Sequence, residues 1–144
     1  MEIFCRIFPA DGLFRDSASY DAGEMTTPYF LLNREFSVDR LICGGSEIPV
    51  ESDPAMIAGW DYAVQKIPLP PAVQALRVEY TGRLSGKTGA FPYVRERITP
   101  AFTLLRWETF PFPLFCPCSE EDIHAALFLQ GDSRWSVRVP AGYE

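Results

Sequence analysis

The segment Leu76-Arg77-Val78-Glu79-Tyr80 decides the fold class, because apolar and charged side chains alternate along it. Successive side chains of a β-strand point to opposite faces, so Leu76, Val78 and Tyr80 are expected to face a core. The segment Trp135-Ser136-Val137-Arg138-Val139 alternates in the same way, and we expect its three apolar side chains in the core too. No segment keeps a helical period over about twelve residues, which indicates a mostly β protein.

Further strand-like runs lie on both sides of this segment, with turn residues about every eight to twelve positions. The alternation slips by one position at Arg40-Leu41, which indicates a β-bulge or an edge strand. Single helical turns are expected at 53–59, which Asp53 and Pro54 would begin, and at 119–122. The sequence therefore predicts a β-sandwich or open β-saddle of about six to eight short strands with one or two single helical turns. The remaining strands are expected at 28–32, 36–43, 60–67 and 125–129.

The length and composition indicate one domain with a hydrophobic core. A chain of 144 residues, 47% of them hydrophobic, is typical of a single globular domain and not of a disordered segment. Turn signals at Pro9, Asp11-Gly12 and Asp21-Ala22-Gly23 favour an irregular segment over residues 1–26. We expect the β-domain to comprise residues 27–144.

The charge is acidic overall but unevenly distributed. The net charge of -6 argues against nucleic acid as a partner. Residues 62–114 nevertheless hold seven basic and three acidic side chains, whereas residues 1–61 hold four basic and eleven acidic ones. A basic middle is compatible with a docking face, but solvated faces of strands produce the same count and are the favoured interpretation. The charge pattern alone therefore does not establish a docking face.

The sequence contains no segment expected to enter a membrane. No apolar run approaches the roughly 20 residues that span a bilayer. The first residues, Met1-Glu2-Ile3-Phe4-Cys5-Arg6, lack the basic and apolar blocks of a signal peptide. The compartment stays open, and the chain could belong to a membrane-associated protein.

The run from Thr81 to Thr88 ends in Gly-Lys-Thr and superficially resembles a phosphate-binding loop. The motif requires glycine at the first position, where Thr81 stands, and a helix directly after the loop. Gly89-Ala90-Phe91-Pro92 follows instead and cannot begin a long helix. The run is interpreted as a glycine-rich turn.

The remaining candidates for chemistry are Cys116, Cys118 and His124. One residue separates the two cysteines, whereas zinc sites usually have two to four residues between such ligands, and a fourth ligand is missing nearby. A single histidine also excludes the paired histidines of a metallopeptidase helix. We therefore expect no catalytic, cofactor-binding or metal-binding residue in this chain, and reduced cysteines at all four positions, which are Cys5, Cys43, Cys116 and Cys118.

The order of these segments resembles the N-terminal β-domain of aminopeptidase-N-like zinc metallopeptidases, in the bacterial branch associated with transporter permeases. The resemblance covers about residues 27–143. It departs from the family at the Trp-Tyr-Pro element, because three residues separate Trp107 from Pro111. The segments that carry it are 29–33, 67–70, 76–84, Phe91-Pro92-Tyr93-Val94, Arg95-Glu96-Arg97-Ile98, Leu104-Leu105-Arg106, Phe110-Pro111 and 137–140.

The resemblance implies a non-catalytic accessory domain that buttresses a catalytic domain and walls its substrate cavity. Zinc would be bound only in that separate domain, because the zinc-binding helix and the catalytic tyrosine of the family are missing here. We expect the docking contact at the aromatic and proline-rich region Phe91–Phe115, with a peptidase domain or another protein as partner. The same region could instead pack in the core or line a ligand groove. The alternative function is a stand-alone β-sandwich module that binds protein or carbohydrate.

Overall fold

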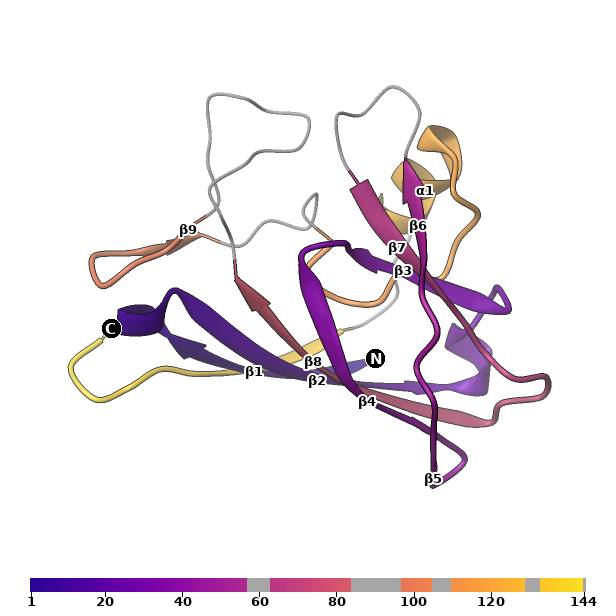
Figure 1. The fold of residues 1–144 in the computed structure, drawn as a ribbon, viewed down its shortest axis with the longest axis horizontal. Helices are drawn as coiled ribbons and strands as arrows, with labels where there is room; N and C mark the ends of the chain where they lie inside the picture. The colour runs from indigo at the N-terminus through magenta and orange to yellow at the C-terminus, as the bar shows by residue number, and fades with distance from the viewer. Residues whose placement is uncertain (57–62, 84–96, 105–109, 129–132, 144) are drawn as a thin grey trace.

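The computed structural model describes residues 1–56, 63–83, 97–104, 110–128 and 133–143. A six-stranded sheet has the order β11-β1-β2-β8-β4-β5, and a three-stranded sheet has the order β3-β7-β6. A short hairpin, β9–β10, and one helix complete the described elements. Figure 1 shows the larger sheet in the lower half, with the smaller sheet and α1 above it.

The bounds of the elements show which part of the sequence builds each layer. The larger sheet consists of β1 (Glu2–Phe8), β2 (Leu13–Asp21), β4 (Phe36–Cys43), β5 (Ser46–Ile48), β8 (Ala75–Arg83) and β11 (Arg134–Arg138). The smaller sheet consists of β3 (Tyr29–Asn33), β6 (Asp53–Met56) and β7 (Ala63–Pro68). The other elements are the 3-10 turns η1 (Pro9–Asp11) and η2 (Ala22–Glu24), the strands β9 (Arg97–Ile98) and β10 (Thr103–Leu104), and the helix α1 (Glu120–Phe128).

The core lies between the two sheets and includes the irregular segment 110–116. Leu114 exchanges two backbone hydrogen bonds with Leu31 of β3, at 2.8 and 2.9 Å. Two buried tyrosines of the larger sheet donate to carbonyls of the same segment: Tyr20 to Pro113 at 2.8 Å and Tyr80 to Pro111 at 2.7 Å. Buried backbone groups need such partners. The segment is therefore held by the smaller sheet through its backbone and by the larger sheet through tyrosine side chains.

The expected mostly β fold is confirmed, and so is the position of its central strand. Leu76, Val78 and Tyr80 of β8 are all buried. The predicted bulge is also present, since the pairing of β4 with β8 shifts between Val38 and Arg40. The described residues form eleven strands, more than the six to eight expected, because several are only two to four residues long.

The prediction of an irregular segment over 1–26 is wrong, because β1 and β2 lie there. The turn signals were genuine, but they mark only the hairpin, where η1 leads into Gly12 at φ 62°. The strands on either side carry buried residues at every second position. In β2 this alternation contains Asp16, a charged residue type in a core position, which concealed the pattern.

The expected burial of Trp135, Val137 and Val139 is also wrong. Their exposed fractions are 40%, 58% and 40%. The period of two was correct, since Trp135 pairs with Ile3 and Val137 with Cys5, whose side chains are buried on the inner face. However, β11 is the edge strand of the sheet. An edge strand has a neighbour on one side only, so its inner-face side chains stay partly uncovered.

In two segments the structure has a strand where a helical turn was predicted, or a helix where a strand was predicted. The expected helical turn at 53–59 is wrong where the structure describes it, because Asp53–Met56 is strand β6 paired with β7. The expected strand at 125–129 lies largely in α1. The predicted helix start is confirmed, since the Ser119 Oγ accepts a hydrogen bond from the Asp122 backbone N–H at 3.2 Å.

We expect Val78→Ala to lower the free energy of unfolding by about 1–3 kcal/mol. Val78 is fully buried on β8 between β2 and β4, so truncation removes buried methyl groups and leaves a cavity. Urea denaturation measures the effect. Val137→Ala, on the exposed edge strand, is the control and should leave the midpoint nearly unchanged; equal midpoints for both variants would contradict the prediction.

Candidate functional site

The outer face of the larger sheet carries three arginines at directly paired positions. Arg6 of β1 pairs with Arg138 of β11 on one side and with Arg15 of β2 on the other. Paired residues of neighbouring strands project from the same face of a sheet. The three exposed side chains therefore form a line across three strands, here named the arginine row.

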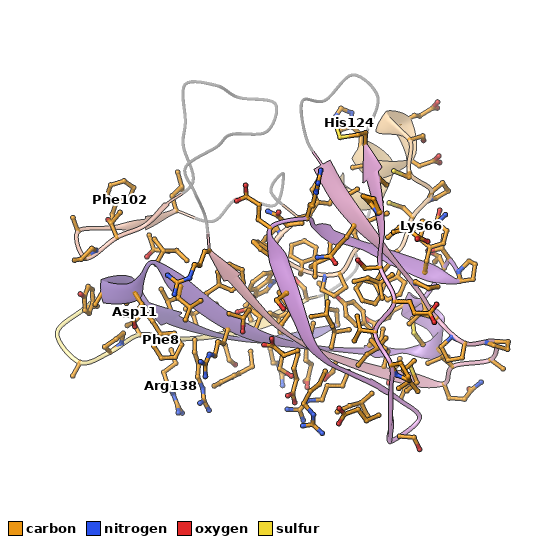
Figure 2. All side chains as sticks on the ribbon, in the orientation of Figure 1. Phe8, Asp11, Lys66, Phe102, His124 and Arg138 are labelled. Atoms are coloured by element: carbon orange, nitrogen blue, oxygen red, sulfur yellow. The ribbon has the colours of Figure 1, made fainter. Side chains whose placement is uncertain are left out.

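Two phenylalanines lie under the arginine row. The Arg6 guanidinium is 5.3 Å and the Arg138 guanidinium 5.6 Å from the centre of the Phe4 ring, while Arg15 is 5.7 Å from Phe8. The ring faces attract cations and restrict the long side chains. Figure 2 shows Phe8 and Arg138 together on the side of the larger sheet that faces away from the smaller sheet.

Among the ion pairs between described residues, none includes a member of the arginine row. Other arginines on the same face do have acidic partners. Arg40 contacts Glu47 at 2.9 Å, Arg77 contacts Glu79 at 2.9 Å, and Arg134 lies 3.8 Å from Glu2. Like charges directly opposite each other destabilise a sheet. The row is therefore a local concentration of positive charge that no described acidic side chain neutralises, in a chain that is acidic overall.

Guanidinium groups in this arrangement suit the recognition of anions. Each presents several N–H donors in a rigid planar fork that matches a carboxylate or a phosphate. The arginine row contains no group that could act as a general base or a nucleophile at neutral pH. The arginine row can therefore bind anions.

The inner face of the same strands holds a buried polar cluster of Cys5, Asp16 and Tyr80, which are paired across β1, β2 and β8. Their exposed fractions are 1%, 5% and 1%. The Tyr80 hydroxyl donates to the Pro111 carbonyl at 2.7 Å and also lies 3.2 Å from Asp16 Oδ2. A hydroxyl has a single proton, so a proton on Asp16 best satisfies the second contact.

Burial raises the pKa of Asp16 from 3.8 to about 7, although the neighbouring Cys5 thiol and Tyr80 hydroxyl act in the opposite direction. Burial, with the nearby Asp16, also raises the pKa of the Cys5 thiol. Among the described residues, the Asp16 Oδ1 atom has no hydrogen-bond partner. An uncharged carboxyl fits this environment, because an ionised one would lack compensation. The cluster is closed to solvent and is part of the core.

The candidates Cys116, Cys118 and His124 lie close in sequence, but the described structure does not group them as a metal site. Cys116 is buried, Cys118 is half-buried and His124 is exposed on α1; both cysteines are free thiols. Burial, followed by the charges of Asp122 and Cys118, raises the pKa of the Cys116 thiol to about 12. Within the described ranges, no three histidine, cysteine or carboxylate side chains are grouped as metal ligands would be.

The other predicted regions are only partly described. Thr81 lies in β8, and the rest of the glycine-rich run is largely outside the described residues. Of the expected docking region Phe91–Phe115, residues 91–96 and 105–109 also lie outside them. The described part of this region has two environments. Phe102 is 54% exposed, whereas residues 110–115 are buried in the core.

No protein-family model matches the chain, and no curated protein matches it in sequence. In the part of the chain that the structure describes, no helix is long and apolar enough to cross a membrane. The arginine row is therefore identified from geometry.

Sequence reasoning missed the arginine row because charge was counted by segment. Arg6 and Arg15 belong to the acidic first part of the chain, and Arg138 to its acidic end. The alternation of Ile3, Cys5 and Ile7 with the charged residues Glu2 and Arg6 could have placed Arg6 on an outer face, although Phe4 and Phe8 at the same face weaken the pattern. The strand pairing that assembles the row is visible only in the structure.

Proposed function

We propose that this chain is a non-catalytic binding domain that docks against an acidic protein surface. The observation that carries the proposal is the arginine row, in which three paired guanidinium groups have no acidic partner among the described residues. Such a cluster lowers stability unless a ligand neutralises it. Carboxylates of a partner would supply that neutralisation and two-point hydrogen bonds.

A protein fits this surface better than a nucleic acid. The whole chain has a net charge of -6, which repels a polyanion at long range. Acidic side chains also lie on the same sheet face, among them Glu2 and Glu79. A nucleic acid carries a phosphate at every step and would meet these groups, whereas a folded protein can place its carboxylates against the row alone.

The narrower form of the proposal names the partner as the catalytic domain of an aminopeptidase-N-like zinc peptidase. It is supported by the resemblance of residues 27–143 to the β-domain that buttresses such enzymes. The arginine row would then contact the peptidase domain, and zinc would be bound there. The alternative is a stand-alone module for protein or carbohydrate. A zinc-binding helix encoded in the same gene would support the first form, and its absence from the gene would support the second.

The test compares two triple variants of the same face. Replacing Arg6, Arg15 and Arg138 by alanine should weaken binding to poly-glutamate at least about tenfold, because the charge-assisted hydrogen bonds are lost. The unfolding free energy should stay equal or rise slightly, since like charges are removed. Isothermal titration calorimetry and urea denaturation measure the two quantities.

The matched control replaces arginines that already have carboxylate partners, and these are Arg40, Arg77 and Arg134. It removes the same charge from the same sheet face and should weaken binding by less than about twofold. Equal losses in both variants would show attraction by overall charge and contradict the proposal. Tighter binding to DNA than to poly-glutamate would indicate that the partner is a nucleic acid and not an acidic protein.

A further inference from the structure

The edge strand β11 has a free side. It pairs with β1 in parallel, and no other described strand lies beside it. All five of its residues are exposed, which agrees with an uncovered edge. An edge of this kind offers backbone groups to an additional strand.

The orientation of the free backbone groups follows from the pairing. The Arg134 N–H donates to the Met1 carbonyl at 3.1 Å. In a parallel pair, alternate residues of a strand direct both their N–H and C=O groups toward the neighbour. Arg134, Ser136 and Arg138 therefore face β1, and Trp135 and Val137 direct their N–H and C=O groups to the open side.

The side chains of β11 separate by chemistry. Trp135 and Val137 project from the inner face, where the Trp135 ring meets Phe112 edge-on with centres 5.5 Å apart. Arg134 and Arg138 project from the outer face, and Arg138 is the end of the arginine row. A strand added here would have one apolar and one basic neighbouring surface.

We propose that a partner binds by adding a strand with alternating apolar and acidic side chains to the free edge of β11. This inference rests on the proposed function and specifies how the acidic partner is bound. The backbone of the added strand pairs with Trp135 and Val137. Its apolar side chains extend the inner face, and its carboxylates continue the arginine row beside Arg138.

Charge argues against a second copy of this chain as the occupant. Two β11 strands related by a two-fold axis through Ser136 would pair antiparallel, as a closed dimer requires. Arg134 of each copy would then lie opposite Arg138 of the other, and like charges directly opposite are unfavourable. A carboxylate-bearing strand places the opposite charge at these positions.

The experiment uses a synthetic peptide of about ten alternating glutamate and valine residues, the length of a long strand. Val137→Pro removes one open-side N–H and should weaken peptide binding about tenfold or more. Val137→Thr keeps the N–H and the branched shape and should change it by less than about threefold. A peptide with the same residues in two blocks, acidic then apolar, should bind at least about tenfold more weakly.

A second measurement does not depend on the folding of a variant. The alternating peptide with N-methyl groups on every second backbone amide, made in both registers, is titrated against the unchanged protein. One register should lose binding, because its N-methyl groups meet the edge of β11, and the other should retain it. Equal binding of both registers would overturn the inference.

The two proposals fail in different ways. If the arginine-row variant loses the peptide but Val137→Pro binds it normally, strand addition is wrong and the acidic docking surface stands. If the unchanged protein binds neither this peptide nor poly-glutamate, both proposals are wrong. Concentration-dependent dimerisation that Val137→Pro abolishes would assign the edge to a second copy and overturn the inference.

Discussion

Replacing Asp16 by asparagine is expected to remove a large pH-dependent component of the stability of this domain. The pKa of Asp16 is raised to about 7 from an ordinary 3.8, chiefly by burial. One unit of pKa difference corresponds to about 1.4 kcal/mol, so ionising Asp16 in the core costs on the order of 4 kcal/mol. The introduced asparagine would stay neutral at every pH, and its amide can donate to the Tyr80 hydroxyl oxygen as the carboxyl proton does.

The direction of the effect follows from proton binding. Between pH 3.8 and about pH 7 the folded protein retains the Asp16 proton and the unfolded chain does not. The contribution of Asp16 to stability is therefore complete below pH 3.8 and declines as the pH rises through about 7. The difference in unfolding free energy between Asp16→Asn and the unchanged protein should increase in favour of the variant from acid to pH 8.

Urea denaturation at a series of pH values measures this difference. Asp53→Asn on the exposed strand β6 is the control and should follow the unchanged protein at each pH. Cys5 and Tyr80 face Asp16 and have raised pKa values, so they stay protonated over this range. A constant difference between Asp16→Asn and the unchanged protein would show that Asp16 does not hold its proton in the fold.

Gly82→Val is expected to destabilise the domain by about 3 kcal/mol or more. Gly82 of β8 pairs with Phe14 on one side and with Phe36 on the other, and the two rings close over it. A Cβ atom at this position would lie 2.6 Å from Phe36 Cδ1 and closer still to the Phe14 ring. Every side chain larger than hydrogen therefore displaces a core aromatic.

The rings have little room to move. Phe14 and Phe36 pack edge-to-face with centres 4.8 Å apart, and Phe36 stacks against Tyr80 at 6.3 Å. Thermal and urea unfolding of Gly82→Val measure the loss, and Gly23→Ala, which meets no atom within 4 Å, is the control. Phe14→Leu combined with Gly82→Ala should cost less than the sum of the two single changes. Additive costs would mean that the ring is not the obstacle.

The sequence could predict the central strand β8, although it missed β1, whose buried residues Ile3, Cys5 and Ile7 are also apolar. Leu76, Val78 and Tyr80 alternate without interruption, and their burial was predicted correctly. The alternation in β2 includes Asp16, whose burial depends on a retained proton and on Tyr80, a residue 64 positions away. Trp135 and Val137 show the opposite case. Their period is as regular as that of β8, but a period does not reveal whether a strand is central or at the edge.

The arginine row was predictable only in part. Arg6 and Arg15 come together through a short hairpin, and a correct assignment of the turn at Pro9 and Gly12 would have paired them. Arg138 reaches the row through parallel pairing between the first and last strands of the sheet in chain order. No local pattern encodes that contact, because its register depends on the whole intervening fold.

The parallel pairing of β1 with β11 also has a consequence for the synthesis of the protein. The two strands lie at opposite ends of the chain, so β1 emerges from the ribosome long before its neighbour exists. At translation rates of roughly 5–20 residues per second, the interval is on the order of ten seconds. During this time one side of β1 is an unprotected edge with Ile3, Cys5 and Ile7 beside it. We therefore expect this side of β1 to stay unpaired until β11 has been synthesised.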